Sequence, residues 1–198
     1  MVPITVRPPT FSPAAPPADF KLPTIAWLME TWHVTHSTLP MWKSKRNVRI
    51  QYTPLDPSSP EIAKEHTDRV DDLVSYQGLT DDKVSTVRGI DKAATTTNGE
   101  SRGEWDWRGK GWLKIASSHW EVLAWGEEEG TGNKWMVTMF AKTLFTPAGI
   151  DVYSKAREGV QAGTLNNIKA VLSHVDDSDV QEMAGALFEI QSDDSRTD

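Results

Sequence analysis

The feature that most constrains this fold is a series of short runs of β-branched and aromatic residues, separated by turn residues, between residues 30 and 154. Apolar and polar residues alternate within a run, as they do in strands with one buried face. The clearest runs begin at Trp32, Asn47 and Trp135, and others cover residues 69–77, 83–90, 101–107, 112–117, 119–125 and 149–154. About nine antiparallel strands are too many for one open sheet with a solvated face, so we expect closure.

Helical periodicity appears only after these strands. A first helix is expected to begin near Thr164, and four apolar residues share one of its faces: Leu165, Ile168, Leu172 and Val175. A second helix is predicted over residues 180–190, because Ser178 and Gln181 have the spacing of a capping box. The order of elements predicts a mainly β protein, a closed antiparallel up-and-down β-barrel of about eight to ten strands with C-terminal α-helices.

The two ends of the chain differ from its body. Residues 1–22 are rich in proline, which favours a flexible segment over packed structure. Residues 192–198 form a short acidic tail. We therefore expect a single domain, the barrel with its helices, over residues 23–191.

Composition excludes several classes of function. The net charge of −7 argues against a surface that neutralises nucleic-acid phosphates. The lack of cysteine excludes disulfides, thiolate metal sites and a cysteine nucleophile. No apolar run approaches the roughly 18 residues of a membrane span, and residues 1–20 lack the apolar core of a signal peptide. The expectation is a cytoplasmic protein with neither nucleic acid nor membrane as partner.

Nine tryptophans are a large number for this length, and six of them lie between Trp105 and Trp135. Rings of this size either wall an apolar cavity or form a stacking surface. Proteins that stack single-stranded nucleic acid also need a basic groove, which an acidic chain does not favour. The tryptophans therefore favour a cavity.

Two short motifs resemble those of lipocalins. Glu30-Thr31-Trp32 resembles the Gly-x-Trp signature that opens their first strand, with Glu30 at the glycine position. Residues 151–155 resemble their last strand, with Lys155 at or next to the arginine that packs over that tryptophan. The resemblance covers about residues 25–176, extends to the broader calycin group and to small fungal lipocalin-like proteins, and implies an eight-stranded barrel around an apolar pocket.

Inward side chains decide what such a barrel holds. His36 shares the face of Trp32, and is either a hydrogen-bonded residue at the barrel mouth or a ligand contact. Asp72 and Arg88 either pair inside the cavity, because a buried charge needs a partner, or lie outside. The predicted ligand-binding residues are Trp32, His36, Tyr52, Tyr76, Arg88, Trp120, Trp135 and Met139.

Three functions remain open. The first is binding of a small hydrophobic or aromatic molecule without a cofactor. The second is a cofactor-free cyclase or isomerase acting on a polyketide- or terpenoid-like intermediate of secondary metabolism, with catalytic candidates His36, Asp72, Tyr76 and Arg88. The third is a haem protein with His36 or His119 as axial ligand. No metal-ligand spacing is present, so no metal site is expected, and the sequence predicts neither the ligand nor the oligomeric state.

Overall fold

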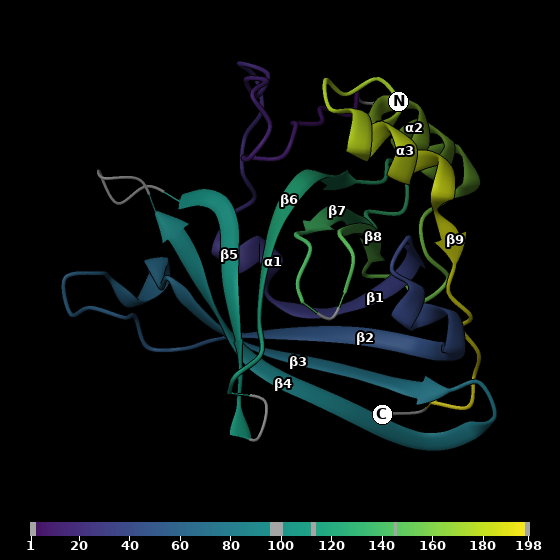
Figure 1. The fold of residues 1–198 in the computed structure, drawn as a ribbon, viewed down its shortest axis with the longest axis horizontal. Coiled ribbons are helices and arrows are strands. Elements are labelled where there is room, and N and C mark those ends of the chain that lie inside the picture. Colours follow the sequence, from purple (N-terminus) through teal and green to yellow (C-terminus); the bar gives the residue numbers. More distant parts are fainter. Residues whose placement is uncertain (1–2, 96–100, 112–113, 145, 197–198) are drawn as a thin grey trace.

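Eight antiparallel strands close into a barrel in the computed structural model, which describes residues 3–95, 101–111, 114–144 and 146–196. Strand β1 pairs with both β2 and β8, which completes the cylinder (Figure 1). The strands are β1 (Glu30–Ser37), β2 (Lys45–Pro54), β3 (Arg69–Gly78), β4 (Asp81–Thr95), β5 (Ser101–Gly109), β6 (Ser117–Glu127), β7 (Lys134–Phe140) and β8 (Gly149–Ser154). The predicted barrel is confirmed. No strand forms over the described residues 114–116, and Trp112, where a strand was expected to begin, lies outside the described residues.

One end of the barrel is closed by the first helical turn and a tryptophan. Helix α1 (Ile25–Leu28) lies across this end, and the Trp32 indole donates a hydrogen bond of 2.8 Å to the Leu28 carbonyl. The Lys155 ammonium lies 4.1 Å from the centre of the Trp32 ring and donates to the Met29 carbonyl. A cation over an indole ring is favourable. This is the contact that the resemblance to lipocalins implies for Lys155.

Glu30 occupies the position where the resemblance implies glycine. Its φ is +82°, in a region that non-glycine residues rarely adopt because the Cβ atom is crowded. The local backbone therefore has a conformation that favours glycine, with a glutamate at the position.

Two helices cover one side of the barrel. Helices α2 (Ala162–Leu172) and α3 (Ser178–Ala186) share an apolar layer with residues from the outer faces of β6, β7 and β8 (Figure 1). Helix α2 begins before the expected Thr164, and the Asp177 carboxylate rather than Ser178 caps α3 by accepting from the Val180 N–H. The second helix is shorter than predicted, because residues 188 and 189 form strand β9 (Phe188–Glu189), which pairs with β1.

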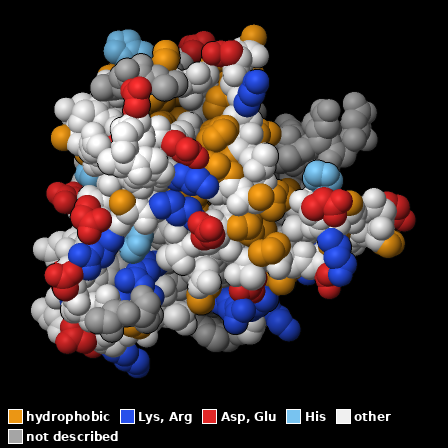
Figure 2. Space-filling view, turned by 180° about the vertical axis from the view of Figure 1, so that it is seen from behind, with side chains coloured by type: hydrophobic (Ala, Val, Ile, Leu, Met, Phe, Trp, Pro, Cys, Tyr) orange, Lys and Arg blue, Asp and Glu red, His pale blue; other side chains and the backbone are white. Residues whose placement is uncertain are grey.

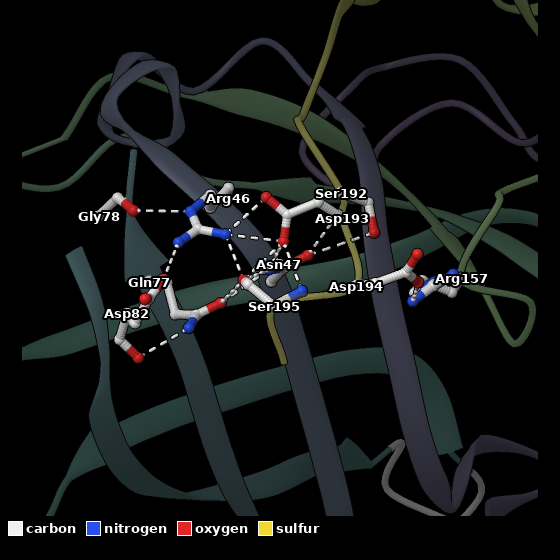
Figure 3. Close-up of polar contacts among 10 residues, drawn as sticks. All are labelled: Arg46, Asn47, Gln77, Gly78, Asp82, Arg157, Ser192, Asp193, Asp194 and Ser195. Atoms are coloured by element: carbon white, nitrogen blue, oxygen red, sulfur yellow. Dashed lines mark hydrogen bonds and ion pairs between the residues drawn. The ribbon is translucent and has the colours of Figure 1, made fainter. Parts of the chain in front are cut away.

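The C-terminal segment is fastened to β2 (Figure 3). Arg46 forms an ion pair of 2.5 Å with Asp193, and its guanidinium also donates to the Gly78 carbonyl. Asn47 donates to the Gln77 side chain at 2.7 Å and to Asp193 at 2.8 Å. The acidic tail is thus bonded to the barrel through side chains of two neighbouring strands.

The described N-terminal residues before α1, from residue 3 on, form no helix or strand, yet they also contact the barrel. The Arg7 guanidinium forms a buried ion pair of 2.7 Å with Glu121 of β6, and its backbone N–H donates to the Leu123 carbonyl. This segment covers part of the outer face of β6.

The outer surface carries charges of both signs. On the face shown in Figure 2, the described acidic and basic side chains are intermixed around a band of hydrophobic groups. This pattern differs from the continuous basic surface with which proteins bind duplex nucleic acid. None of the helices in the described part of the chain is long and apolar enough to cross a membrane.

Candidate functional site

The barrel contains a cavity of about 350 Å³. Its wall includes residues from the β1–β2, β5–β6 and β7–β8 connections, so it lies toward the end of the barrel opposite Trp32. Aromatic side chains form much of the wall: Trp42, Tyr52, Tyr76, Trp107, Trp120, Phe140 and Tyr153. The volume is at the lower end of the range typical of small-molecule sites, which are also mostly apolar.

Stacked rings form the inner part of the wall. Tyr52 of β2 stacks on Trp120 of β6 with ring centres 5.6 Å apart, and Trp120 stacks on Trp105 at 5.7 Å. The first pair connects opposite sides of the barrel, and the second joins register partners on the neighbouring strands β5 and β6. Offset stacking of this kind stabilises the arrangement beyond the area that it buries, and it gives the cavity a rigid aromatic floor.

A glycine on β4 makes room for another wall residue. A Cβ atom at Gly89 would lie 2.2 Å from the indole nitrogen of Trp107, far closer than two non-bonded atoms can approach. Glycine therefore lets the Trp107 ring lie directly over the backbone of the neighbouring strand. The shape of this wall depends on both residues.

Asp151 of β8 is a buried carboxyl group with two partners. It accepts a hydrogen bond of 2.5 Å from the Ser37 hydroxyl and one of 3.3 Å from the Trp42 indole. Burial nevertheless raises the pKa of Asp151 to about 7, because the loss of hydration penalises its charged form more than these bonds favour it. The hydrogen bond to Asp151 holds the Trp42 indole at the cavity wall.

Asp72 of β3 and Asp91 of β4 form the second acidic region. Asp91 accepts a hydrogen bond of 2.9 Å from the Trp120 indole, and burial raises its pKa to about 7. Burial also raises the pKa of Asp72 well above its ordinary value, and the charges of Asp91 and Asp71 add to this increase. At neutral pH the floor of the cavity therefore holds carboxyl groups that retain protons readily.

Four predicted site residues line this cavity: Tyr52, Asp72, Tyr76 and Trp120. Trp32 is fully buried inside the barrel, but it lies at the closed end and is not part of the cavity wall. Inward positions on β2 and β3 follow the predicted alternation.

His36 does not share the inner face of Trp32. A β-bulge between Val34 and His36 shifts the register against β8, so that Ser37 rather than His36 reaches Asp151 inside the barrel. One extra residue reverses the faces of all positions that follow it. His36 instead lies outside, near Lys169 of α2, and burial lowers its pKa.

Arg88 also lies outside the cavity. Its guanidinium pairs with Asp71 at 2.8 Å and is 59% exposed, while Lys110 binds the other oxygen of Asp71 at 2.5 Å. The pairing of Arg88 with Asp72 inside the barrel is therefore wrong. Val87 is the β4 residue that faces the cavity.

Trp135 and Met139 were expected to face inward, and this expectation is wrong. Both belong to the apolar layer between β7 and the two helices, whereas Phe140 faces the cavity. His119 bonds Asp106 at 2.9 Å away from the cavity wall. The described wall contains no histidine to ligate haem, and the described residues contain no cluster of three potential metal ligands.

Sequence reasoning missed several residues in or against the wall, among them Trp42, Asp91, Asp151 and Tyr153. The signal on β8 was present, because Asp151 and Tyr153 are two residues apart and share a face. It was obscured because the alternate residues Ile150 and Val152 are more apolar and are buried too. No local signal connects Asp91 with Trp120, since they are 29 positions apart.

The comparisons with known proteins concern the fold. No family model matches the sequence, and no curated protein matches it either. Among solved structures, the chain is similar to apocrustacyanin C2, with 9% identity, a TM-score of 0.52, and 84% of this chain and 78% of that chain covered. It is also similar to the amine binding protein of Rhodnius prolixus, determined as its tryptamine complex, with 12% identity, a TM-score of 0.52, and coverage of 86% and 85%.

These identities are low, so the likeness concerns the arrangement of the chain. The eight-stranded closed barrel with its C-terminal helices is the lipocalin-like, calycin fold. The resemblance found in residues 30–32 and 151–155 is thereby confirmed at the level of fold.

Proposed function

We propose that this protein binds a small hydrophobic or aromatic molecule inside its barrel. The observation that carries the proposal is the cavity of about 350 Å³ with its wall of tryptophan, tyrosine and phenylalanine rings. A concave, mostly apolar site with a few polar groups is the usual architecture of a small-molecule site. Fold alone does not define function, so the side chains of this wall are the argument.

The solved structures give general support. One protein with this fold is described as an amine binding protein in complex with tryptamine, which is a small aromatic molecule. A barrel of this kind therefore has room for a ligand of that size.

Titration with a panel of hydrophobic and aromatic compounds tests the proposal. Trp42, Trp107 and Trp120 lie at the wall, so binding is expected to change intrinsic tryptophan fluorescence saturably. A flat response across a broad panel would contradict the proposal.

Two substitutions on β4 provide a matched pair. Val87 faces the cavity, whereas Val84 is 36% exposed. Val87→Phe should reduce affinity by about tenfold or more, because the larger ring occupies the ligand volume. Val84→Phe should leave affinity unchanged, and equal effects of both would place the ligand elsewhere.

A second candidate is the cofactor-free cyclase or isomerase. It is favoured by one observation, a carboxyl group at Asp72 that faces an apolar cavity and has a raised pKa, since such a group can donate a proton at neutral pH. Asp72 and Tyr76 are the catalytic candidates that line the cavity. Assays with polyketide- and terpenoid-like intermediates should then show turnover that Asp72→Asn and Tyr76→Phe abolish while binding persists. Turnover unchanged in both variants would remove them from the mechanism.

A further inference from the structure

The polar part of the cavity is acidic. Asp72 and Asp151 are wall residues, and Asp91 lies against the wall residue Trp120. The described wall residues include no lysine, arginine or histidine. A ligand in this cavity therefore meets acidic groups with no basic side chain of the described wall beside them.

The two wall carboxyl groups differ in their partners. Both oxygens of Asp151 accept hydrogen bonds, from Ser37 and Trp42. Asp72 is only 6% exposed, yet its Oδ1 atom has no hydrogen-bond partner among the described residues. The hydroxyl of Tyr153, another fully buried wall residue, lacks a partner in the same sense. Buried polar atoms in native proteins are nearly always satisfied, and a polar group of a bound ligand can supply the partner of these two.

The surrounding rings favour the same kind of partner. Tyr52 is paired in register with Asp72 and stacks on Trp120, and Trp107 and Tyr76 belong to the same wall. The faces of aromatic rings carry negative potential and attract cations, most strongly in a site without water. A carboxylate beside several such faces is a suitable environment for an ammonium group.

We propose that the ligand is a small aromatic molecule that carries a protonated amine, with its ammonium group bound to Asp72 and Tyr153 and its ring held among Trp42, Trp107 and Trp120. This inference rests on the proposed function and adds the charge of the ligand to it. The ammonium donates one hydrogen bond to Oδ1 of Asp72 and another to the Tyr153 oxygen. Both atoms that lack a partner are thereby satisfied.

Ammonium binding displaces protons from the cavity. The groups that bear on Asp72 are Asp91 of β4, Asp71 of β3, the hydrogen-bonding Trp107 side chain of β5, Tyr52 of β2 and Tyr153 of β8, and none of them is cationic. The empty barrel retains a proton on Asp72 because its pKa is raised. An ammonium at this position favours the carboxylate, so the proton passes to solvent while the ligand keeps its own.

Calorimetric titration with three ligands of one ring system tests this inference. The probes are tryptamine, its neutral alcohol counterpart tryptophol, and the anion indole-3-acetate, each measured at pH 7 in two buffers of different ionisation enthalpy. Tryptamine should bind about tenfold or more tightly than tryptophol, and indole-3-acetate should bind still more weakly. Only tryptamine should release protons to the buffer. Equal affinities for tryptamine and tryptophol would overturn the inference.

Two variants test whether Asp72 is the residue that binds the ammonium group. Asp72→Asn keeps the shape of the side chain and should weaken tryptamine by about tenfold while tryptophol binding is retained. Asp106→Asn is the matched control, because this carboxylate lies on β5 with 70% of its side chain exposed, and it should change neither ligand. Tryptamine affinity unaltered by Asp72→Asn would exclude Asp72 as the ammonium site. The comparison of ligands on the unmodified protein decides the matter even if the variant does not fold.

The same titrations separate this inference from the function on which it rests. Binding of hydrophobic panel compounds without any preference for an ammonium group would overturn only the inference. If neither the panel nor the three indoles bind, the proposed function fails with it.

Discussion

The two sides of the barrel differ in what covers them. The outer face of β3–β5 is wet, as the exposed Arg88 and Val84 on β4 illustrate. The outer face of β6–β8 is dry, because α2, α3 and the N-terminal segment pack against it, and every residue of β8 is buried.

This difference explains part of what can be read from sequence, although Trp120 on β6 was placed correctly and Arg88 on β4 was not. Alternation separates an apolar face from a polar face only where the outer face is solvated. On β2, where Gln51 and Thr53 on the outer face are exposed, it correctly placed Tyr52 inside the barrel. On the dry side it placed Trp135 and Met139 inside, although they face the helices.

The largest expected loss of stability comes from a substitution in the apolar layer between the helices and β6–β8. Leu172 of α2 is fully buried in it, so Leu172→Ala should lower the free energy of unfolding by about 2 to 5 kcal/mol. Val84→Ala on the wet side should change it by less than about 0.5 kcal/mol. Urea denaturation measures both, and similar losses would mean that the two sides are not packed differently.

The next effect concerns a hydrogen bond at the closure of the barrel. Ser37→Ala removes the donor to Asp151 and the acceptor of the Leu39 N–H, which should cost about 1 to 3 kcal/mol. Ser117 lies on the exposed rim of the cavity, so Ser117→Ala is a suitable control with an expected change below about 0.5 kcal/mol. Equal values in denaturant titrations would contradict the role of Ser37.

The pH dependence of stability tests the buried acids. Asp151 has a folded pKa of about 7 against an ordinary value of 3.8, so between these values the folded state binds more protons than the unfolded state. Stability is therefore highest below about pH 4 for this group and falls as pH rises toward 7, by at most about 1.4 kcal/mol per pH unit. Asp151→Asn should flatten the curve of unfolding free energy against pH. Parallel curves for variant and parent would show that Asp151 does not titrate in this range.

The smallest expected effect is a gain in the stability of the folded protein. Glu30→Gly should stabilise the protein by about 0.5 to 1 kcal/mol, because glycine adopts the positive φ of this position without strain. Glu30→Ala controls for the loss of the ion pair with Lys155. Thermal unfolding should rank glycine above alanine, and equal midpoints would mean that no strain is relieved.

The limits of sequence prediction have separate physical causes. The closed barrel and the inward face of β2 were predictable from alternation and turns, because each depends on neighbouring residues. The position of His36 was not, because a single bulge in β1 reverses the alternation. The partner of Arg88 depends on the register between β3 and β4. This register sets Arg88 opposite Leu73 and Ile90 opposite Asp71, and the Arg88 side chain bonds Asp71. Contacts such as Asp91 with Trp120 arise only when distant strands meet.

The seam between β1 and β8 has a consequence for the rate of folding. Ser37 and Asp151, which bond across it, are 114 positions apart, so the loop between them must be ordered before this pairing stabilises anything. Topologies dominated by such distant pairings fold on the scale of milliseconds to seconds. Trp42, whose indole bonds Asp151, should therefore report the last phase of a stopped-flow refolding trace. A Trp42→Phe variant that retains that phase unchanged would assign the slow step to another part of the barrel.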